Sequence, residues 1–270
     1  MIAALEYSPR RVGAMVRRSW YLLRSSWPRL LDLIYWPMLQ MVMWGFLQSY
    51  ISQAGGNTLI QAGGFLIGAV LLWDILFRGQ LGFSVSFLEE MYARNLGNIM
   101  MSPLRPVEFI SALMVVSLIR LSIGLIPVTF LAIAFFGFNL WGLGLALVAF
   151  FVNLILTSWA IGLLVAGLLL RNGLGAEALA WTFMFLFLPL TCVYYPVAVL
   201  PGWLQYVAWA LPPTYVFEGM RALLANQVFR ADLMIQAFAY NVVLFAAASL
   251  AFFRLLESAR RHGSLIQSHE

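Results

Sequence analysis

Three ionisable side chains lie within long apolar stretches of the sequence, where charges are rare and usually functional. Asp74 and Arg78 are four residues apart with the acid first, the favourable order for an ion pair on one helix. Arg120 lies 13 residues into the next apolar stretch, which begins at Val107. That distance is about 20 Å along a helix, near the middle of a bilayer. In an antiparallel pair of helices Asp74 also reaches Arg120. The three charges form either a structural ion pair or contacts with a polar substrate.

A second group of candidate residues precedes the last apolar stretch. It consists of Tyr195, Pro196, Pro212, Glu218 and Arg221. Repeated prolines break helices, so residues 196–230 are expected to form short re-entrant helices in the outer half of a membrane. The tyrosines and tryptophans around them are typical of an aromatic belt at the membrane interface. They alternatively form a surface on which a sugar or a drug stacks.

A third segment, residues 89–104, carries two acids and ends in the pair Ser102-Pro103. It is expected to be a short exposed helix with more apolar surface than solvation requires. Such a surface indicates a docking partner.

The composition restricts the class of protein. Of the 270 residues, 63% are hydrophobic and 10% are charged, against about 25% charged in soluble domains. A soluble enzyme, a disordered protein and a disulfide scaffold are therefore excluded. A membrane-embedded enzyme is improbable because both histidines lie in the C-terminal tail and Cys192 has no obvious base. We predict no catalytic residue, no metal site and no nucleic-acid partner.

The candidate residues must be positioned by membrane-spanning helices, for which about 20 apolar residues are needed. Six stretches qualify: Leu30–Ile51, Leu59–Leu88, Val107–Phe136, Leu143–Leu170, Ala178–Tyr195 and Leu233–Leu256. The predicted fold class is an all-α integral membrane protein with six transmembrane helices and re-entrant short helices before the last. The predicted domains are an N-terminal helix (1–29), a transmembrane domain (30–256) and a tail (257–270). Arginines concentrate in alternate loops, which predicts cytoplasmic termini.

The N-terminal segment is predicted to be an amphipathic helix lying in the membrane interface. Ser8 and Pro9 are typical of a helix start. Apolar residues recur at three- and four-residue steps, and Arg11 and Arg18 fall on the opposite face, toward anionic headgroups. The helix is either a topology anchor or a working part of coupling. Asp32 is expected to pair with a nearby arginine such as Arg29 or with lipid headgroups.

Together, these features resemble the membrane subunits of type-two ABC exporters, a family that includes polysaccharide, lipo-oligosaccharide and drug exporters. The resemblance spans nearly the whole chain, including the acidic segment that ends in Ser-Pro and the Pro-Pro-Thr…Glu…Arg run (212–221). In that family the segment after span two is a coupling helix that docks on an ATPase. The resemblance places at this contact Glu89, Glu90, Arg94, Asn95 and Leu96. The sequence Arg-Asn-Leu-Gly-Asn departs here from the family's more basic, Gly-Thr-containing run.

The energy source must lie outside this chain. The sequence has no Gly-rich phosphate loop and no lysine, so it is not a P-loop ATPase. The resemblance implies that a separate ATP-binding subunit holds ATP and magnesium, and that this chain binds no cofactor. It also implies a second permease copy, an identical one in the expected homodimer, with spans one, two and five at the interface. The expected location is the bacterial inner membrane, and the expected cargo is a glycan, a lipid-linked oligosaccharide or a hydrophobic drug.

Two other functions compete with this interpretation. An ion-coupled secondary transporter would use a midplane carboxylate such as Asp74, but the sequence shows no inverted repeat and few membrane acids. A non-transporting scaffold would explain the helical bundle but not the docking segment.

Overall fold

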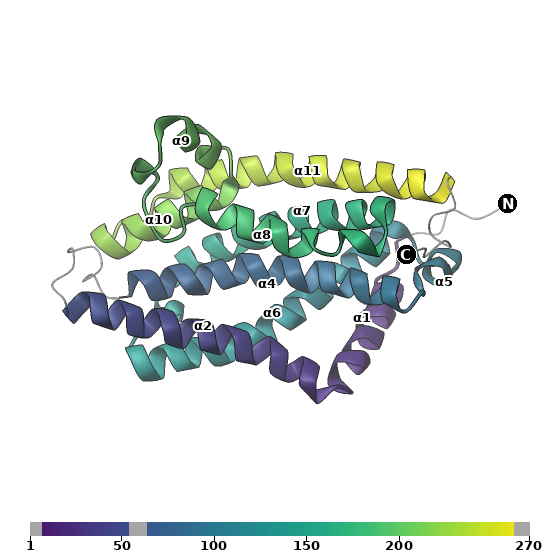
Figure 1. Cartoon of the computed structure of the whole chain (residues 1–270), viewed down its shortest axis with the longest axis horizontal. Coiled ribbons are helices and arrows are strands. Elements are labelled where there is room, and N and C mark those ends of the chain that lie inside the picture. The colour runs from purple at the N-terminus through teal and green to yellow at the C-terminus, as the bar shows by residue number, and fades with distance from the viewer. Residues whose placement is uncertain (1–6, 54–63, 262–270) are drawn as a thin grey trace.

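The computed structural model describes residues 7–53 and 64–261, and every regular element in these ranges is helical (Figure 1). The long helices are α2 (Trp27–Gln53), α4 (Phe65–Tyr92), α6 (Pro106–Phe136), α7 (Leu145–Asn172) and α11 (Ala231–Arg261). The shorter helices are α1 (Pro9–Arg24), α5 (Leu96–Met101), α8 (Leu179–Leu190), α9 (Gly202–Trp209) and α10 (Pro212–Asn226). Single 3₁₀ turns are η1 (Leu140–Leu143), η2 (Leu174–Ala176) and η3 (Val197–Val199).

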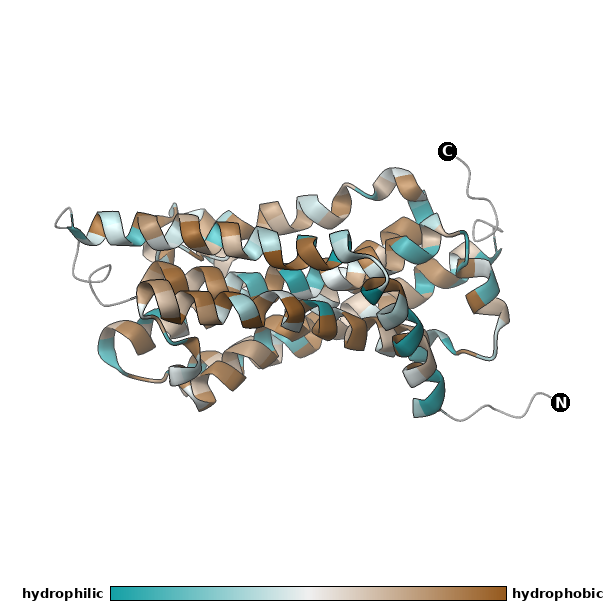
Figure 2. Cartoon of the chain, turned by 90° about the horizontal axis from the view of Figure 1, so that it is seen from below, coloured by the Kyte–Doolittle hydropathy of each residue, from teal (hydrophilic) through white to brown (hydrophobic). Residues whose placement is uncertain are grey.

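The five long helices are apolar enough to cross a membrane, which confirms the prediction of an all-helical, multi-pass membrane protein. Hydrophobic residues cover most of the length of the bundle (Figure 2). The predicted fifth span, residues 178–195, corresponds to α8, which has 12 residues and contains Pro189. At about 1.5 Å per residue, α8 is shorter than the hydrocarbon core. Among the described residues, the structure therefore shows five candidate spans and one shorter apolar helix.

Helix α4 is the centre of the bundle and packs against α2, α6 and α7, while α11 covers α7. Two glycines allow this close packing. A Cβ atom at Gly82 would lie 3.1 Å from the Cα atom of Ser117 on α6, and one at Gly79 would lie 2.7 Å from Ile155 on α7. Small residues at helix crossings are typical of membrane bundles, where backbones approach closely.

Helices α2 and α6 meet at a proline and a glycine. Pro37 lies inside α2 and has no N–H group, so the carbonyl of Leu33, four residues earlier, receives no hydrogen bond from it. This carbonyl faces Gly124 of α6, where a Cβ atom would lie 2.6 Å from the oxygen. The crossing therefore requires a residue without a side chain at position 124.

Polar side chains join α7 to α11 within the apolar core. The hydroxyl of Thr157 donates to Oδ1 of Asn241 at 2.6 Å, and the amide of Asn241 donates to the carbonyl of Asn153 at 2.9 Å. All three residues are buried. Such hydrogen bonds hold membrane helices together because no water competes for the groups.

The N-terminal helix begins with Pro9 as expected, and two residues, Ser25 and Ser26, separate it from α2. The first membrane helix starts at Trp27, three residues before the predicted boundary. The apolar face of α1 lies against the chain itself, because α1 packs along α6 and buries Val12 and Met15.

Candidate functional site

The intramembrane pair predicted on α4 is present. The Nε atom of Arg78 lies 3.5 Å from Oδ1 of Asp74, and the Asp74 side chain is fully buried. Neither carboxylate oxygen of Asp74 has a hydrogen bond among the described residues. A buried carboxylate held only by a neighbouring arginine depends strongly on that arginine.

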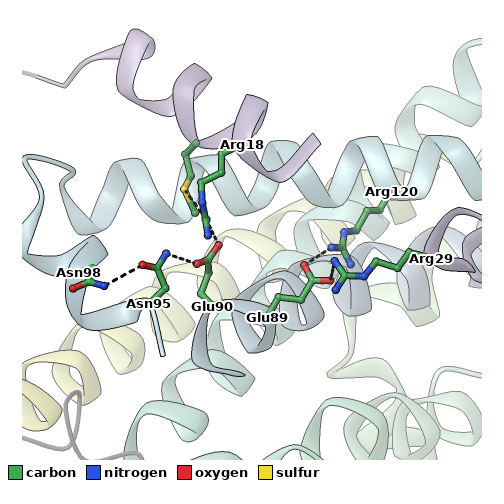
Figure 3. A network of polar contacts seen from close by, with 8 residues as sticks. Arg18, Arg29, Glu89, Glu90, Asn95, Asn98 and Arg120 are labelled. Atoms are coloured by element: carbon green, nitrogen blue, oxygen red, sulfur yellow. Dashed lines mark hydrogen bonds and ion pairs between the residues drawn. The ribbon is translucent and has the colours of Figure 1, made fainter. Parts of the chain in front are cut away.

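Arg120 does not join this pair, so the expected contact with Asp74 is wrong. Its Nη2 atom donates to Oε2 of Glu89 at 2.6 Å. The guanidinium of Arg29 lies 3.6 Å from the other oxygen of Glu89. Glu89 is 15 residues further along α4 than Asp74, so Arg120 points to the end of α4 that leads into α5. Figure 3 shows both arginines pointing toward the Glu89 carboxylate.

The next residue, Glu90, joins three parts of the chain. Its carboxylate accepts hydrogen bonds from Arg18 of α1 and from the side-chain amide of Asn95, the latter at 3.0 Å. The backbone N–H of Asn95 also donates to the carbonyl of Glu90 at 3.0 Å. Glu90 is 4% exposed. It therefore links α1, the end of α4 and the turn that precedes α5 (Figure 3).

A third carboxylate, Glu108, fixes the start of α1 to the start of α6. Its oxygens accept from the Arg11 guanidinium at 2.9 and 2.5 Å, from the Ser8 backbone N–H at 2.8 Å and from the Arg105 backbone N–H at 2.9 Å. The Glu108 carboxylate raises the pKa of Arg11 by this hydrogen bonding. Arg11 and Arg18 were expected to face lipid headgroups, but both bind carboxylates of the protein. The reason is that the buried acids Glu90 and Glu108 need a charged partner.

We call α5 and the turn before it (residues 93–101) the elbow. Its predicted contact residues differ in their exposure: Arg94 is exposed, Asn95 is half-buried, and Leu96 is 5% exposed and belongs to the core. Leu96 therefore holds the elbow to the bundle. The outward side chains are those of Arg94, Asn98 and Met101, the last 81% exposed.

The elbow begins with an unusual backbone conformation. Arg94 has φ +50°, in the left-handed region that residues other than glycine and asparagine rarely adopt. This conformation turns the chain between α4 and α5 and projects the Arg94 side chain outward.

At the other end of the bundle, Glu218 and Arg221 of α10 hold the loop that follows α8. Glu218 accepts from the Val197 backbone N–H at 2.8 Å and from Arg221 at 3.0 Å. Arg221 also donates to the carbonyl of Cys192 at 2.8 Å. These contacts fix α10 to the segment around Cys192 and Val197.

A cavity of about 760 Å³ lies beside this loop. Four of the five predicted outer residues line it, namely Tyr195, Pro196, Glu218 and Arg221. Pro212 does not; it begins α10 and is buried. The remaining wall includes Phe65, Tyr194 and Trp209. The cavity thus combines aromatic faces with a few charged groups, the usual composition of a ligand pocket.

Sequence reasoning did not single out Glu108 or pair Arg18 with Glu90. For Glu108 a local signal exists, because Pro106 and Glu108 occupy the first and third positions of a helix, where a carboxylate caps backbone N–H groups. For Arg18 and Glu90 no signal exists, because their pairing depends on how α1 packs against the bundle.

Asp32 was expected to pair with an arginine such as Arg29 or with lipid. Arg29 binds Glu89 instead, and Asp32 accepts a hydrogen bond from the Trp36 indole at 2.9 Å. The headgroup alternative stays a prediction.

Comparison with known families gives a match over most of the chain. Residues 10–225 match the family described as ABC-2 type transporter. The matched region runs from α1 into the last turn of α10 and includes every site residue predicted from the sequence. No curated protein matches the chain.

Proposed function

Because this chain belongs to the ABC-2 type transporter family and is a multi-pass membrane permease, we propose that it is the export permease of an ATP-driven pump. Its ATPase is a separate subunit that binds ATP and magnesium. The chain itself binds no cofactor and hydrolyses nothing.

The observation that carries this proposal is the pair of adjacent acids at the end of α4. Glu90 ties the elbow to α1, and Glu89 ties the same turn of α4 to α2 and α6 through Arg29 and Arg120. A force applied to the elbow therefore reaches the central helix and two of its neighbours directly. Networks of ion pairs and hydrogen bonds that connect helices in this way can carry energetic coupling between distant sites.

We propose six crossings with both termini in the cytoplasm of a bacterial inner membrane. In this arrangement η2 and α8 form the fifth crossing, and α9 and α10 are short helices that re-enter the outer half. The arginine distribution supports the orientation. Pro189 lies in the last turn of α8, and Pro196 follows the helix. Prolines at these positions support a crossing whose remaining length is non-helical backbone packed against protein.

The transport pathway is proposed to lie between two identical copies. The exposed faces of α2 and α8 are apolar and aromatic, including Trp36, Phe46 and Phe185. Helix α4, expected from the family resemblance to share the interface, is mostly covered by its neighbours. We therefore assign the contact between copies mainly to α2 and α8. The aromatic outer cavity lies next to this path and supports a glycan, a lipid-linked oligosaccharide or a hydrophobic drug as the cargo.

A substitution on the exposed face of the elbow tests the proposal. Met101→Glu should weaken co-purification with the ATPase and reduce ATP-driven export at least about tenfold, because a charge replaces an apolar contact. Tyr206→Glu is the matched control, since Tyr206 is 82% exposed on α9 at the other end of the bundle. Export and ATPase capture that survive Met101→Glu unchanged would overturn the docking assignment.

A further inference from the structure

A cavity of about 290 Å³ lies where α1 ends and α2 begins. Leu23, Pro28 and Leu33 form its apolar part, and four charged residues form its polar part: Arg29, Asp32, Glu89 and Arg120. Three separate elements, α2, α4 and α6, contribute these charges. This cavity is separate from the outer cavity, and no residue of the elbow lines it.

The charges of this cavity are balanced in number, but not all of them form ion pairs. Glu89 is shared by two arginines, with N–O distances of 2.6 Å to Arg120 and 3.6 Å to Arg29. This group of three therefore carries one excess positive charge. Asp32 makes no ion pair among the described residues and accepts only the Trp36 indole N–H. It supplies one excess negative charge.

One guanidinium of the cavity has an unused hydrogen-bond donor. Arg120 is 7% exposed, lines the cavity and has no hydrogen-bond partner for its Nε atom among the described residues. A buried N–H without a partner costs free energy unless a ligand or a water satisfies it. Figure 3 shows Arg120 and Arg29 pointing toward the same carboxylate, so an acceptor near either would contact the same positive group.

In the proposed membrane arrangement, the helices around the cavity place it at the depth of lipid headgroups. It is bounded by the end of the amphipathic helix α1 and the first turns of the first membrane helix, which begins at Trp27. Trp27, Tyr35 and Trp36, all in the first ten residues of α2, are exposed, and exposed aromatic residues of this kind mark the membrane–water interface.

We propose that this cavity binds the headgroup of a zwitterionic aminophospholipid, phosphatidylethanolamine, with the phosphate at Arg29 and Arg120 and the ammonium at Asp32. An anionic lipid would satisfy the arginines but repel Asp32. A phosphocholine lipid carries both charges but has no N–H group to donate to a carboxylate. The inference uses the proposed orientation to assign the lipid to the cytoplasmic leaflet, whereas binding itself requires only that the chain spans a membrane.

The test measures lipid retention by the purified full-length chain and involves no transport. The chain is incubated with equal amounts of phosphatidylethanolamine, phosphatidylglycerol and phosphatidylcholine with identical acyl chains, and native mass spectrometry counts the bound lipids. Phosphatidylethanolamine should be retained about tenfold over the other two, the effect expected for one hydrogen bond between charged groups.

Two exposed residues provide the variants, so neither is expected to impair folding. Asp32→Asn should lower phosphatidylethanolamine retention to the level of phosphatidylglycerol, whereas Arg29→Gln should lower retention of both lipids. The matched control is Arg17→Gln, because Arg17 is exposed on α1 and does not line the cavity; it should retain the wild-type preference.

Three outcomes would overturn the proposal. One is equal retention of the three lipids by the unmodified chain, and another is an unchanged preference in Asp32→Asn. The third is Asp32-dependent binding of free phosphoethanolamine without retention of the lipid, which would assign the cavity to a soluble zwitterion. None of these outcomes bears on ATP-driven export, so the two proposals fail separately.

Discussion

Buried acidic side chains hold several helices of this molecule together through ion pairs with arginines. Asp74, Glu89, Glu90 and Glu108 are wholly or largely covered, and each has an arginine within 4 Å. In a bundle with few charges, an acid inside the structure is stable only with such a partner. For three of these four acids, the arginine comes from another helix. The buried acids therefore determine where these helices contact one another.

The Asp74–Arg78 pair is expected to behave as a unit. Asp74→Ala leaves Arg78 without its partner inside the bundle and should destabilise the protein by about 3–5 kcal/mol. Adding Arg78→Ala should restore part of this loss. A double-mutant cycle on thermal unfolding in detergent measures the coupling.

The parallel cycle with Arg120→Ala is the control, because Arg120 binds Glu89 and not Asp74. It should give a coupling energy near zero. Equal coupling of Asp74 to both arginines would contradict the pairing seen in the structure.

At the scale of residues, sequence reasoning found the charges but not all of their partners. Asp74 and Arg78 could be paired because helical periodicity alone brings them together. Arg120 was assigned to Asp74 as well, since the spacing along a helix gives depth but not the register between two helices. Its actual partner, Glu89, is selected by how α4 and α6 slide past each other, which packing at Gly82 and Ser117 decides.

The helices themselves could largely be read from hydropathy, because long apolar runs have one stable form in a bilayer. The boundaries of α2, α6 and α7 follow the apolar stretches to within three residues, whereas α4 and α11 end four and five residues beyond theirs. The predicted start of the second stretch, Leu59, lies outside the described residues. The exception is the fifth stretch, where an 18-residue apolar run contains only the 12 residues of α8. Its tyrosines and Pro196 favour a loop that Glu218 and Arg221 then hold, a tertiary effect that composition does not reveal.

At the crossing of α2 and α6, adding a single methyl group to Gly124 should destabilise the protein. Gly124→Ala would place its Cβ atom 2.6 Å from the carbonyl oxygen of Leu33, so α2 must move away. The expected loss of stability is about 1–3 kcal/mol, typical of overpacking. Thermal unfolding of the purified protein measures it.

Gly175→Ala is the matched control, because nothing lies within 4 Å of the Cβ position there. It should leave the midpoint of unfolding within a degree or two of the unmodified protein, about the effect of a typical surface change. An equal shift in both variants would show that the α2–α6 crossing tolerates a side chain.

At the scale of the whole molecule, the apolar bundle separates two ends that should lie on opposite sides of the membrane. A cysteine at either end should therefore react with an impermeant reagent from one side only. The single cysteine, Cys192, is buried and should not react with a membrane-impermeant maleimide in intact cells. Gly202→Cys on α9 should react from outside, and Ser102→Cys after α5 should react only after the cells are opened; both positions are exposed. The opposite pattern would reverse the proposed orientation.

The basic residues at the α5 end of the bundle have one further consequence, for covalent regulation. All cations of its ion pairs are arginines, and the chain contains no lysine. Guanidinium groups keep their charge throughout the pH range of a living cell, and lysine acetylation has no target among them. The charge network that joins α1, α4 and α6 is therefore closed to control by acylation of its basic side chains.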